Sequence, residues 1–314
     1  MKFARPIDWV VLDRIPSRAT MILAGAAKRA KKTLLALHLA ECVARGASWI
    51  GHEVRKREAV FTGFEGGRSF LAQRLLDVGH STTFGDEVPA PIFFADGMRG
   101  YEDCLAEMRR RAGAGEAYPI LWIIDTLSQV LARSDIDEND NMAVTRYLAG
   151  IDEVAIAVDA AVLFVHHFSK QGMQMRGASA MMGVCNWCDI TTVKGGDGAL
   201  RLDWVLRHGP GGADGVKVQK PNGKFTFEVV DLAEVSKREG ADRNEVVREA
   251  LTEHLKSRSG QMTTTRSLQE VATRALGKKI GIRTVSEAVR FMVREGAPIT
   301  SSIGGAEPGF VWRE

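Results

Sequence analysis

The sequence predicts an α/β fold with a parallel core sheet, followed by a small, separate C-terminal unit. Short continuous apolar runs, which suit parallel strands buried on both faces, recur along the first two thirds of the chain. Segments with helical periodicity alternate with these runs, as in α/β proteins. Near residue 235 the alternation gives way to charged helical segments, which predicts the separate unit.

The first unit is expected to alternate strands and helices along most of its length. Its last two strands are separated by Gly-rich turns, which predicts antiparallel pairing at one edge of the sheet. Apolar residues make up 45% of the 314 residues, enough for a substantial core. The predicted strands are 20–25, 59–65, 91–97, 120–126, 161–167, 187–194 and 200–209, and the predicted helices are 31–46, 68–77, 101–112 and 142–158.

The C-terminal unit combines two short helices with a terminal hairpin around Gly304 and Gly305. A helix, a second helix and then a hairpin is the order typical of a winged helix-turn-helix domain. From Lys256 onward there are ten Lys and Arg residues against five Glu and no Asp, so this unit is locally basic. The expected domains are 1–230 for the α/β unit, 231–255 for a linker helix and 256–314 for the winged helix.

The stretch "RTVSEAVRFMVREG" is the predicted recognition helix for duplex DNA. Its periodicity places Val285, Val289 and Met292 in the core and leaves Arg283, Arg290 and Arg294 exposed. Winged helices also serve as protein-docking modules, so that alternative stays open.

Bulk properties set limits on the class of protein. The net charge is only +3, so any nucleic-acid binding must come from local basic patches. No run of about 18 apolar residues occurs, which predicts a cytoplasmic protein without a membrane span. Cys185 and Cys188 form a CNWC pair with no second pair or histidine cluster nearby, which favours buried free thiols over a zinc or redox site.

The stretch "GAAKRAKKT", residues 25–33, follows a predicted strand and partly matches the phosphate-binding pattern G-x-x-x-x-G-K-[ST]. Aligned on Gly25, the pattern retains Lys31, but Ala30 replaces the second glycine and Lys32 replaces the hydroxyl residue. Shifted by one residue, it recovers Lys32 and Thr33 but loses both glycines. The candidate nucleotide contacts are Gly25, Lys28, Lys31, Lys32 and Thr33.

Three further strand ends carry polar side chains suited to nucleotide chemistry. Asp125 ends an apolar strand, as expected of a carboxylate that holds Mg²⁺ through water. Glu65 stands beside two glycines and is suited to polarising an attacking water, and His167 could sense a γ-phosphate. Because the carboxyl ends of parallel strands meet at one edge of a sheet, we expect the strands that end at Gly25, Glu65, Asp125 and His167 to be adjacent there.

In this order the motifs resemble those of RecA-like ATPases, typified by the hexameric replicative helicases of the plasmid RepA type and their phage and mobile-element relatives. The resemblance spans about residues 5 to 210. It implies ATP and Mg²⁺ as cofactors, with Lys31 as the phosphate lysine, Asp125 at the metal, Glu65 as catalytic base and His167 as sensor. Thr33 would reach the metal only if the loop bulged by one residue. The motifs that carry the resemblance are "PIDWVV", "LAGAAKRAKKTLLALHLA", "FTGFEGG", "LWIIDTLSQV", "DENDNMA", "LFVHHFSKQG" and "MRGASAMMG".

The resemblance also implies a homo-oligomeric ring around single-stranded DNA. A basic residue of one subunit would complete the neighbouring site, and Arg176 and Arg207 are the two candidates. The channel loops would be about 128–143 and 169–180, with Lys170 and Arg176 following the phosphate backbone in the second loop. The first loop is acidic, and a solvated loop is the alternative interpretation.

The function expected from these features is an ATP-dependent DNA motor, helicase or loader acting on single-stranded DNA in plasmid, phage or mobile-element replication. Because Ala30 and Lys32 depart from the pattern, we expect slow or absent ATP hydrolysis. A catalytically impaired pseudo-ATPase that acts as a DNA-binding scaffold or regulator is therefore the main alternative. A recombinase-like filament protein is a third.

Overall fold

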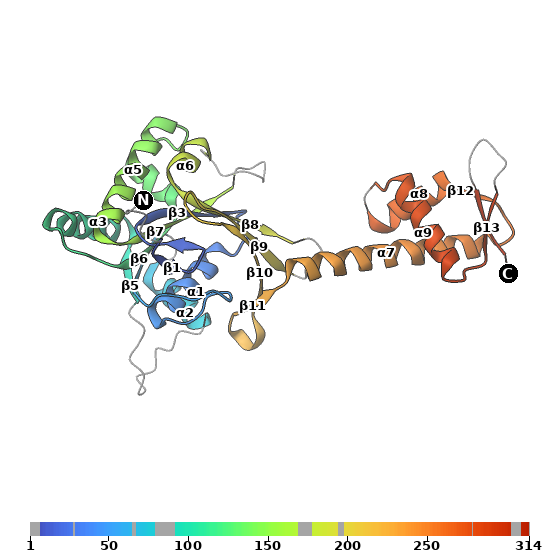
Figure 1. Ribbon diagram of the computed structural model, residues 1–314, viewed down its shortest axis with the longest axis horizontal. Helices are drawn as coiled ribbons and strands as arrows, with labels where there is room; N and C mark the ends of the chain where they lie inside the picture. Colours follow the sequence, from blue (N-terminus) through green and yellow to red (C-terminus); the bar gives the residue numbers. More distant parts are fainter. Residues whose placement is uncertain are drawn as a thin grey trace, which may run out of the picture. The chain divides into compact units, whose positions relative to one another are not determined.

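A computed structural model describes residues 7–27, 29–64, 67–78, 92–168, 178–193, 198–277, 279–302 and 309–313. The chain divides into two units, Met1–Leu232 and Ala233–Glu314 (Figure 1). The first unit is a mixed α/β domain, as the sequence predicts.

The first unit is built on a nine-stranded sheet with strand order β11-β10-β9-β8-β3-β7-β6-β4-β5. The strands of this unit are β1 (Trp9–Val11), β2 (Ile15–Pro16), β3 (Ala19–Gly25), β4 (Glu58–Gly63), β5 (Ile92–Asp96), β6 (Ile120–Asp125), β7 (Ala161–His167), β8 (Asn186–Thr192), β9 (Ala199–Val205), β10 (Gly212–Gln219) and β11 (Thr226–Val230). Its helices are α1 (Lys32–Arg45), α2 (Gly67–Asp77), α3 (Gly97–Ala114), α4 (Leu127–Arg133), α5 (Asn141–Val158), α6 (Ala178–Val184) and the 3₁₀ turn η1 (Pro221–Gly223).

Six neighbouring strands of the sheet, from β8 to β5, run parallel. The strands β9, β10 and β11 add to β8 in antiparallel orientation. The predicted parallel core is confirmed. Of the two late strands expected to add in antiparallel orientation, β9 does so, whereas β8 pairs in parallel with β3 and belongs to the parallel core. A large, mostly parallel sheet of this kind fits the core of RecA-like ATPases.

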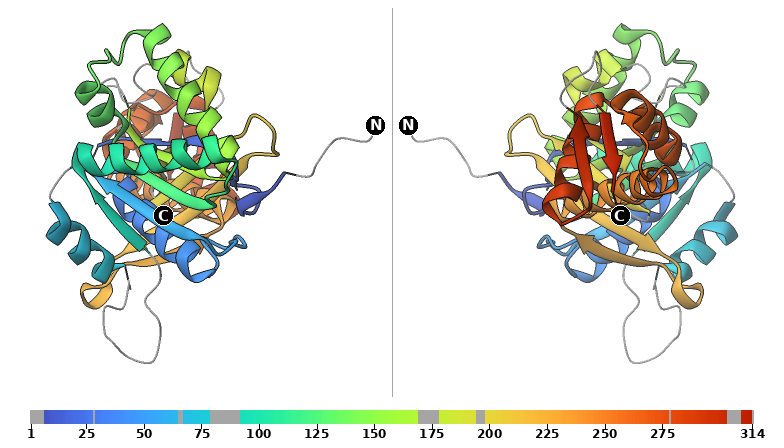
Figure 2. Two further views of the ribbon diagram at one scale, coloured as in Figure 1. Left: turned by 90° about the vertical axis from the view of Figure 1, so that its left-hand side faces the viewer. Right: turned by 90° about the vertical axis from the view of Figure 1, so that its right-hand side faces the viewer.

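Helices cover both faces of the sheet (Figures 1 and 2). Alternate residues of each strand point to opposite faces, so Phe61 packs with α1 and α2, whereas Trp122 packs with α3, α4 and α5. The central strand β3 is buried on both faces, which explains its unbroken apolar sequence.

The small hairpin of β1 and β2 is fixed to β10 by a carboxylate, Asp214. Arg14 donates to it twice, from Nε at 2.6 Å and from Nη2 at 2.9 Å, and both side chains are only 11% exposed. Trp204 Nε1 donates at 2.7 Å and His52 Nε2 lies 3.1 Å away. Burial alone would raise the pKa of Asp214, but the hydrogen bonds from Arg14 and His52 outweigh it and lower the pKa.

The second unit contains the long helix α7 (Leu232–Ser257), α8 (Thr265–Leu276), α9 (Ile282–Arg294) and a three-stranded antiparallel sheet (Figure 2, right). The strands β12 (Thr263–Thr264), β13 (Ile299–Ser302) and β14 (Gly309–Trp312) lie in the order β12-β14-β13. The predicted sequence of two short helices and then two paired strands is confirmed, while the turn at Gly304 and Gly305 lies outside the described residues.

The unit boundary and several short elements differ from the sequence prediction. The helix α7 runs past residue 255, and its residues Val247, Leu251 and Leu255 belong to the core of the second unit. The division of the chain falls between Leu232 and Ala233, so most of the predicted linker helix belongs to the second unit. The elements without a predicted counterpart are β1, β2, α4, α6, β10, η1, β11 and β12.

Among the described residues, no helix is both long and apolar enough to cross a membrane. The four cysteines are free thiols, and Cys185 and Cys188 are buried, as predicted. Burial raises the pKa of the Cys185 thiol to about 12, which makes this thiol a weak nucleophile.

Candidate nucleotide site

The strand ends that carry polar residues lie side by side at the carboxyl ends of the parallel strands. Gly25 at the end of β3 is in register with His167 on β7, and Asp125 on β6 is in register with Val165 on β7. The strand β4 ends at Gly63, beside Asp125, and the backbone N–H of Phe64 donates to the Asp125 carbonyl at 3.1 Å. The predicted adjacency of the β3, β6 and β7 ends is confirmed, while Glu65 lies outside the described residues.

The loop between β3 and α1 places the two lysines before Thr33 in different surroundings. Lys31 is the residue before α1 and has a left-handed backbone, with φ 47° and ψ 31°. Its Nζ donates to the carbonyl of Val218 on β10 at 2.6 Å. The Lys31 ammonium therefore contacts the antiparallel strand β10 instead of the carbonyls of its own loop.

Lys32, the first residue of α1, folds back over the loop. Its side chain is buried, with 6% of the residue exposed, and its Nζ donates to the carbonyls of Gly25 at 2.9 Å and Ala26 at 3.2 Å. Burial lowers the pKa of the Lys32 ammonium to about 8, and the nearby Asp125 carboxylate opposes this shift. The result is a buried cation beside the N-terminus of a helix, where anions are favoured.

Thr33 bridges the loop to the next functional strand. Its hydroxyl Oγ1 donates to Asp125 Oδ2 at 2.6 Å, although the two residues are 92 positions apart in the chain. A hydroxyl and a carboxylate side by side form a pair of oxygen ligands of the kind that Mg²⁺ accepts together with phosphate oxygens. No cluster of three or more His, Cys, Asp or Glu residues that could hold a metal occurs within the described part of the chain.

Ala30 lies against Gly25, inside the domain. Only 1% of Ala30 is exposed, and a Cβ placed on Gly25 would lie 2.6 Å from the Ala30 methyl carbon. In the alignment on Gly25, the Ala30 methyl would lie where the phosphates approach, but it packs in the hydrophobic core. The position that needs a left-handed backbone is Lys31, the residue before the buried lysine.

Two histidines end β7, and the buried one links three segments. His166 is fully buried; its Nδ1 lies 3.3 Å from Ser128 Oγ on α4, and its Nε2 lies 3.3 Å from Glu138 Oε1. His167 is half-buried at the strand end, beside Gly25. Ser128 and Glu138 lie within the motifs "LWIIDTLSQV" and "DENDNMA", but neither was predicted as a site residue, because their contacts with His166 form only in the folded domain.

The acidic loop before α5 is ordered by its own side chains. Asp137 Oδ1 accepts from the backbone N–H of Asn139, and Asp140 caps α5 by accepting from the N–H groups of Met142 and Ala143. Glu138 reaches the buried His166 instead. Asp137 and Asp140 therefore have local structural roles.

Several predicted site residues lie elsewhere or outside the described part of the chain. Arg207 follows β9 and lies near the starts of β3 and β8, at the amino ends of the parallel strands and opposite the nucleotide site. Its Nη1 donates to the Val184 carbonyl at 2.7 Å. Asn186, at the start of β8, is buried and accepts from the Arg207 N–H at 2.8 Å. The predicted residues Lys28, Glu65, Lys170 and Arg176 lie outside the described residues.

In the second unit, the predicted pattern of α9 is confirmed. Val285, Val289 and Met292 are buried, and Arg283, Arg290 and Arg294 are exposed. The side chain of Arg283 is 92% exposed and pairs with Glu287 at 2.9 Å.

The sheet and its helix N-terminus define the first unit as a P-loop, RecA-like ATPase domain. The chain matches the family model of the AAA domain over residues 2–173, more than half of its length, and it belongs to that family. Lys32, Asp125 and His167 all lie within the matched region. Domains of this family are typical of nucleotide-hydrolysing motors and in general use a nucleotide and a metal ion. No curated protein matches the chain.

Proposed function

We propose that the chain is an ATP-dependent motor or loader on single-stranded DNA, of the type that serves plasmid, phage or mobile-element replication. The observation that carries the proposal is the arrangement at the N-terminus of α1. There Lys32 lies on the loop carbonyls and Thr33 contacts Asp125. Both contacts are those expected when the phosphate-binding pattern is shifted by one residue, so that Lys32 and Thr33 occupy its K-[ST] positions.

In this alignment Lys32 is the phosphate lysine, and Lys31 stands at the position of the second glycine. The left-handed backbone of Lys31 supports this register, because glycine is the residue that adopts such a backbone without strain. The loop is thus one residue longer than the pattern when it is counted from Gly25. Lys31, which the sequence suggested for the phosphates, is assigned to the contact with Val218 instead.

The donor set fits ATP with Mg²⁺. The N–H groups at the start of α1 and the Lys32 ammonium would face the phosphates, and Thr33 and Asp125 would hold the metal ion. A bound Mg²⁺ would supply positive charge that stabilises the phosphate oxygens during hydrolysis. Glu65 remains the proposed base for the attacking water, and His167 the proposed sensor.

The pseudo-ATPase alternative loses its main support in this register. It depended on a missing hydroxyl and on an alanine methyl near the phosphates. Thr33 supplies a hydroxyl at Asp125, and the Ala30 methyl is buried against Gly25. We therefore propose a competent ATPase in place of the slow or absent hydrolysis expected from the sequence.

The direct test is ATP turnover by the full chain, with and without Mg²⁺ and with and without single-stranded DNA. We expect turnover that requires Mg²⁺ and increases with DNA. Binding of ATP without turnover would favour the pseudo-ATPase scaffold. Turnover that is the same with and without single-stranded DNA would contradict the proposal of a DNA motor.

The affinity for ATP should fall as the pH rises above about 8. The pKa of Lys32 is about 8 without nucleotide, and phosphate favours the charged ammonium, so binding above that pH requires proton uptake. The dissociation constant should rise by about twofold between pH 7 and 8 and then by up to about tenfold per pH unit. Calorimetric titrations from pH 7 to 10 with a non-hydrolysable ATP analogue measure this slope.

Two variants serve as controls for the pH dependence. Lys32→Arg keeps its charge throughout this range and should flatten the curve. Lys31→Ala should retain the wild-type slope. An unchanged slope in Lys32→Arg would assign the titration to another group.

We further propose that the second unit is a winged helix that binds duplex DNA through α9. Support comes from the order of its elements and from the exposed row Arg283, Arg290 and Arg294, opposite the buried face of the helix. These residues follow one another at spacings of seven and four, so they share one side of α9.

Replacing Arg283, Arg290 and Arg294 together by Ala should remove most of the affinity of the full chain for a blunt DNA duplex. If each arginine neutralises one phosphate, the slope of log affinity against log salt falls by about 2.7. Fluorescence anisotropy at several salt concentrations measures both quantities. The matched control replaces Arg258, Arg266 and Arg274, which are also exposed but lie outside α9. Equal loss in both triple variants, or no loss in the first, would contradict the assignment of α9.

The proposed assembly is a homo-oligomeric ring in which Arg176 or Arg207 completes the neighbouring site. For Arg207, the exposed position at the sheet edge opposite its own nucleotide site supports a role toward a neighbouring subunit.

A further inference from the structure

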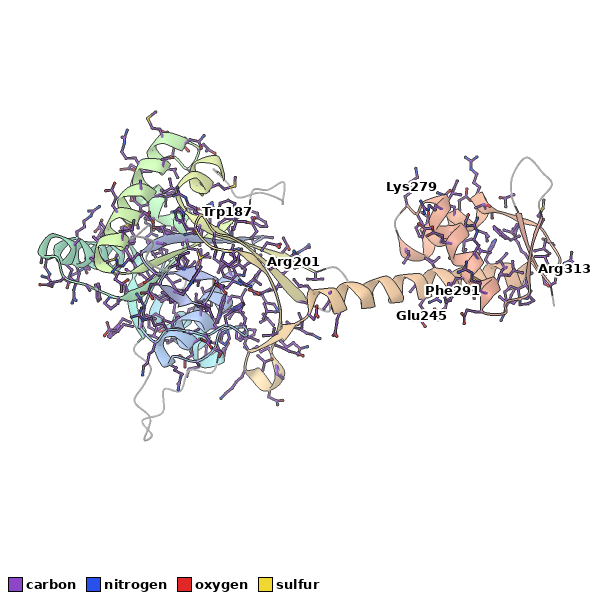
Figure 3. All side chains as sticks on the ribbon, viewed as in Figure 1. Trp187, Arg201, Glu245, Lys279, Phe291 and Arg313 are labelled. Carbon is purple, nitrogen blue, oxygen red and sulfur yellow. The ribbon has the colours of Figure 1, made fainter. Side chains whose placement is uncertain are left out.

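A groove of about 900 Å³ lies between α7 and α9 within the second unit. Its floor is apolar and is formed by Phe291 and Met292 of α9, Ala297 and Trp312. Phe291 is 44% exposed. Figure 3 labels Phe291 and, on the rim contributed by α7, Glu245.

The rim of the groove carries four glutamates. Glu245, Glu249 and Glu253 follow one another at intervals of four residues, so they form one row along α7. Glu295 stands on the other side, directly after α9. All four are exposed, and none of them makes an ion pair with the residues that the structure describes. A row of like charges at this spacing is mildly unfavourable for a helix by itself.

The two basic side chains of the rim lie over the aromatic rings of the floor. The Arg248 guanidinium carbon is 4.5 Å from the centre of the Phe291 ring, and Lys256 Nζ is 5.3 Å from that of Trp312. Each of these two rings is therefore already in contact with a cation of the chain itself. With four carboxylates against two cations, the groove is an acidic patch on a unit that is otherwise basic.

The groove lies beside the proposed DNA surface. At about 100° per residue, Phe291 is about 100° from Arg290 and about 60° from Arg294 around α9. Carboxylates along the rim would repel phosphates, so DNA on the arginine row leaves the groove available for another occupant.

We propose that this groove docks a basic amphipathic segment of a partner protein. A large apolar side chain of that segment would cover Phe291, and its Lys or Arg side chains would pair with Glu249, Glu253 and Glu295. The argument is charge complementarity around an apolar floor, and it is independent of the nucleotide site.

The test uses a fluorescein-labelled helical peptide of sixteen residues, with Leu along one face and Lys on both flanks. Its binding to the full chain is measured by fluorescence anisotropy at 150 mM salt. The reference peptide carries Glu in place of Lys. We expect saturable binding of the Lys peptide and at least tenfold weaker binding of the Glu peptide.

Two groove variants locate the binding site. Glu249→Gln with Glu253→Gln, and separately Phe291→Ala, should each weaken the Lys peptide at least tenfold without changing duplex DNA binding. The matched control, Glu228→Gln with Glu270→Gln, removes the same charge from exposed positions outside the groove. Thermal unfolding of each variant shows that the second unit remains folded.

Equal weakening in the groove and control variants would mean non-specific attraction and would overturn the proposal. Binding of the Glu peptide as tightly as the Lys peptide would overturn it as well. Light scattering addresses a different occupant: if the groove variants change the oligomeric state of the chain, the groove holds a second copy and the proposal is wrong.

Discussion

Replacing Lys32 by Ala is expected to weaken ATP binding by about one to two orders of magnitude and to abolish turnover. A hydrogen bond from a charged group contributes about 1.5 to 3 kcal/mol, which corresponds to that range of affinity. Replacing Lys31 by Ala should change the affinity by less than about threefold, because the Lys31 ammonium contacts Val218 instead of the loop. Titration with a fluorescent ATP analogue compares the two variants directly.

A third variant separates the two possible alignments of the loop. If Lys32 occupied the hydroxyl position, Lys32→Thr would restore the phosphate-binding pattern and increase turnover. With Lys32 as the phosphate lysine, the same change removes the cation and should abolish turnover. Loss of binding in Lys31→Ala together with a gain of turnover in Lys32→Thr would reject the register proposed from the structure.

Replacing Asp214 by Ala should destabilise the first unit by about 3–5 kcal/mol, the cost of leaving a buried charge without its partner. Arg14 would lose both of its charged hydrogen bonds at 11% exposure, and Trp204 would lose the acceptor of its N–H. The linkage between the β1–β2 hairpin and the main sheet would weaken with it. Urea unfolding, followed by tryptophan fluorescence, measures the change.

The matched control is Asp203→Ala on the adjacent strand β9. Asp203 pairs with Arg201 at 2.8 Å, but the two side chains are 39% and 46% exposed. Exposed pairs contribute about 0–1 kcal/mol, so this variant should unfold close to the wild type. Similar losses in both variants would show that burial of the Asp214 network is not what stabilises the unit.

Much of the first unit could be predicted from the sequence because its signals are local. Apolar β-branched runs identified β3, β6 and β7, and the residue that ends each run identified the functional edge of the sheet. The strand β10 was missed because its sequence mixes Gly and charged residues with apolar ones, and β11 was missed because it has only five residues at the edge of the sheet. The helix α4 has only seven residues, too few for a periodic pattern.

The register of the nucleotide loop could not be decided from the sequence. Two alignments one residue apart each retained part of the pattern, and no local preference separates Lys31 from Lys32. The features that distinguish them are the left-handed backbone of Lys31 and the contact between Thr33 and Asp125. The first contradicts the ordinary preference of lysine, and the second joins residues that only the folded sheet brings together.

The central position of β3 has a consequence for synthesis of the chain. Its two neighbours are β7, which begins at Ala161, and β8, which begins at Asn186, so both partners follow it by well over a hundred residues. At about 5–20 residues per second, an apolar strand waits on the order of ten seconds for its first partner to leave the ribosome. During that interval the strand is a natural binding site for a chaperone, and slow elongation would prolong its exposure.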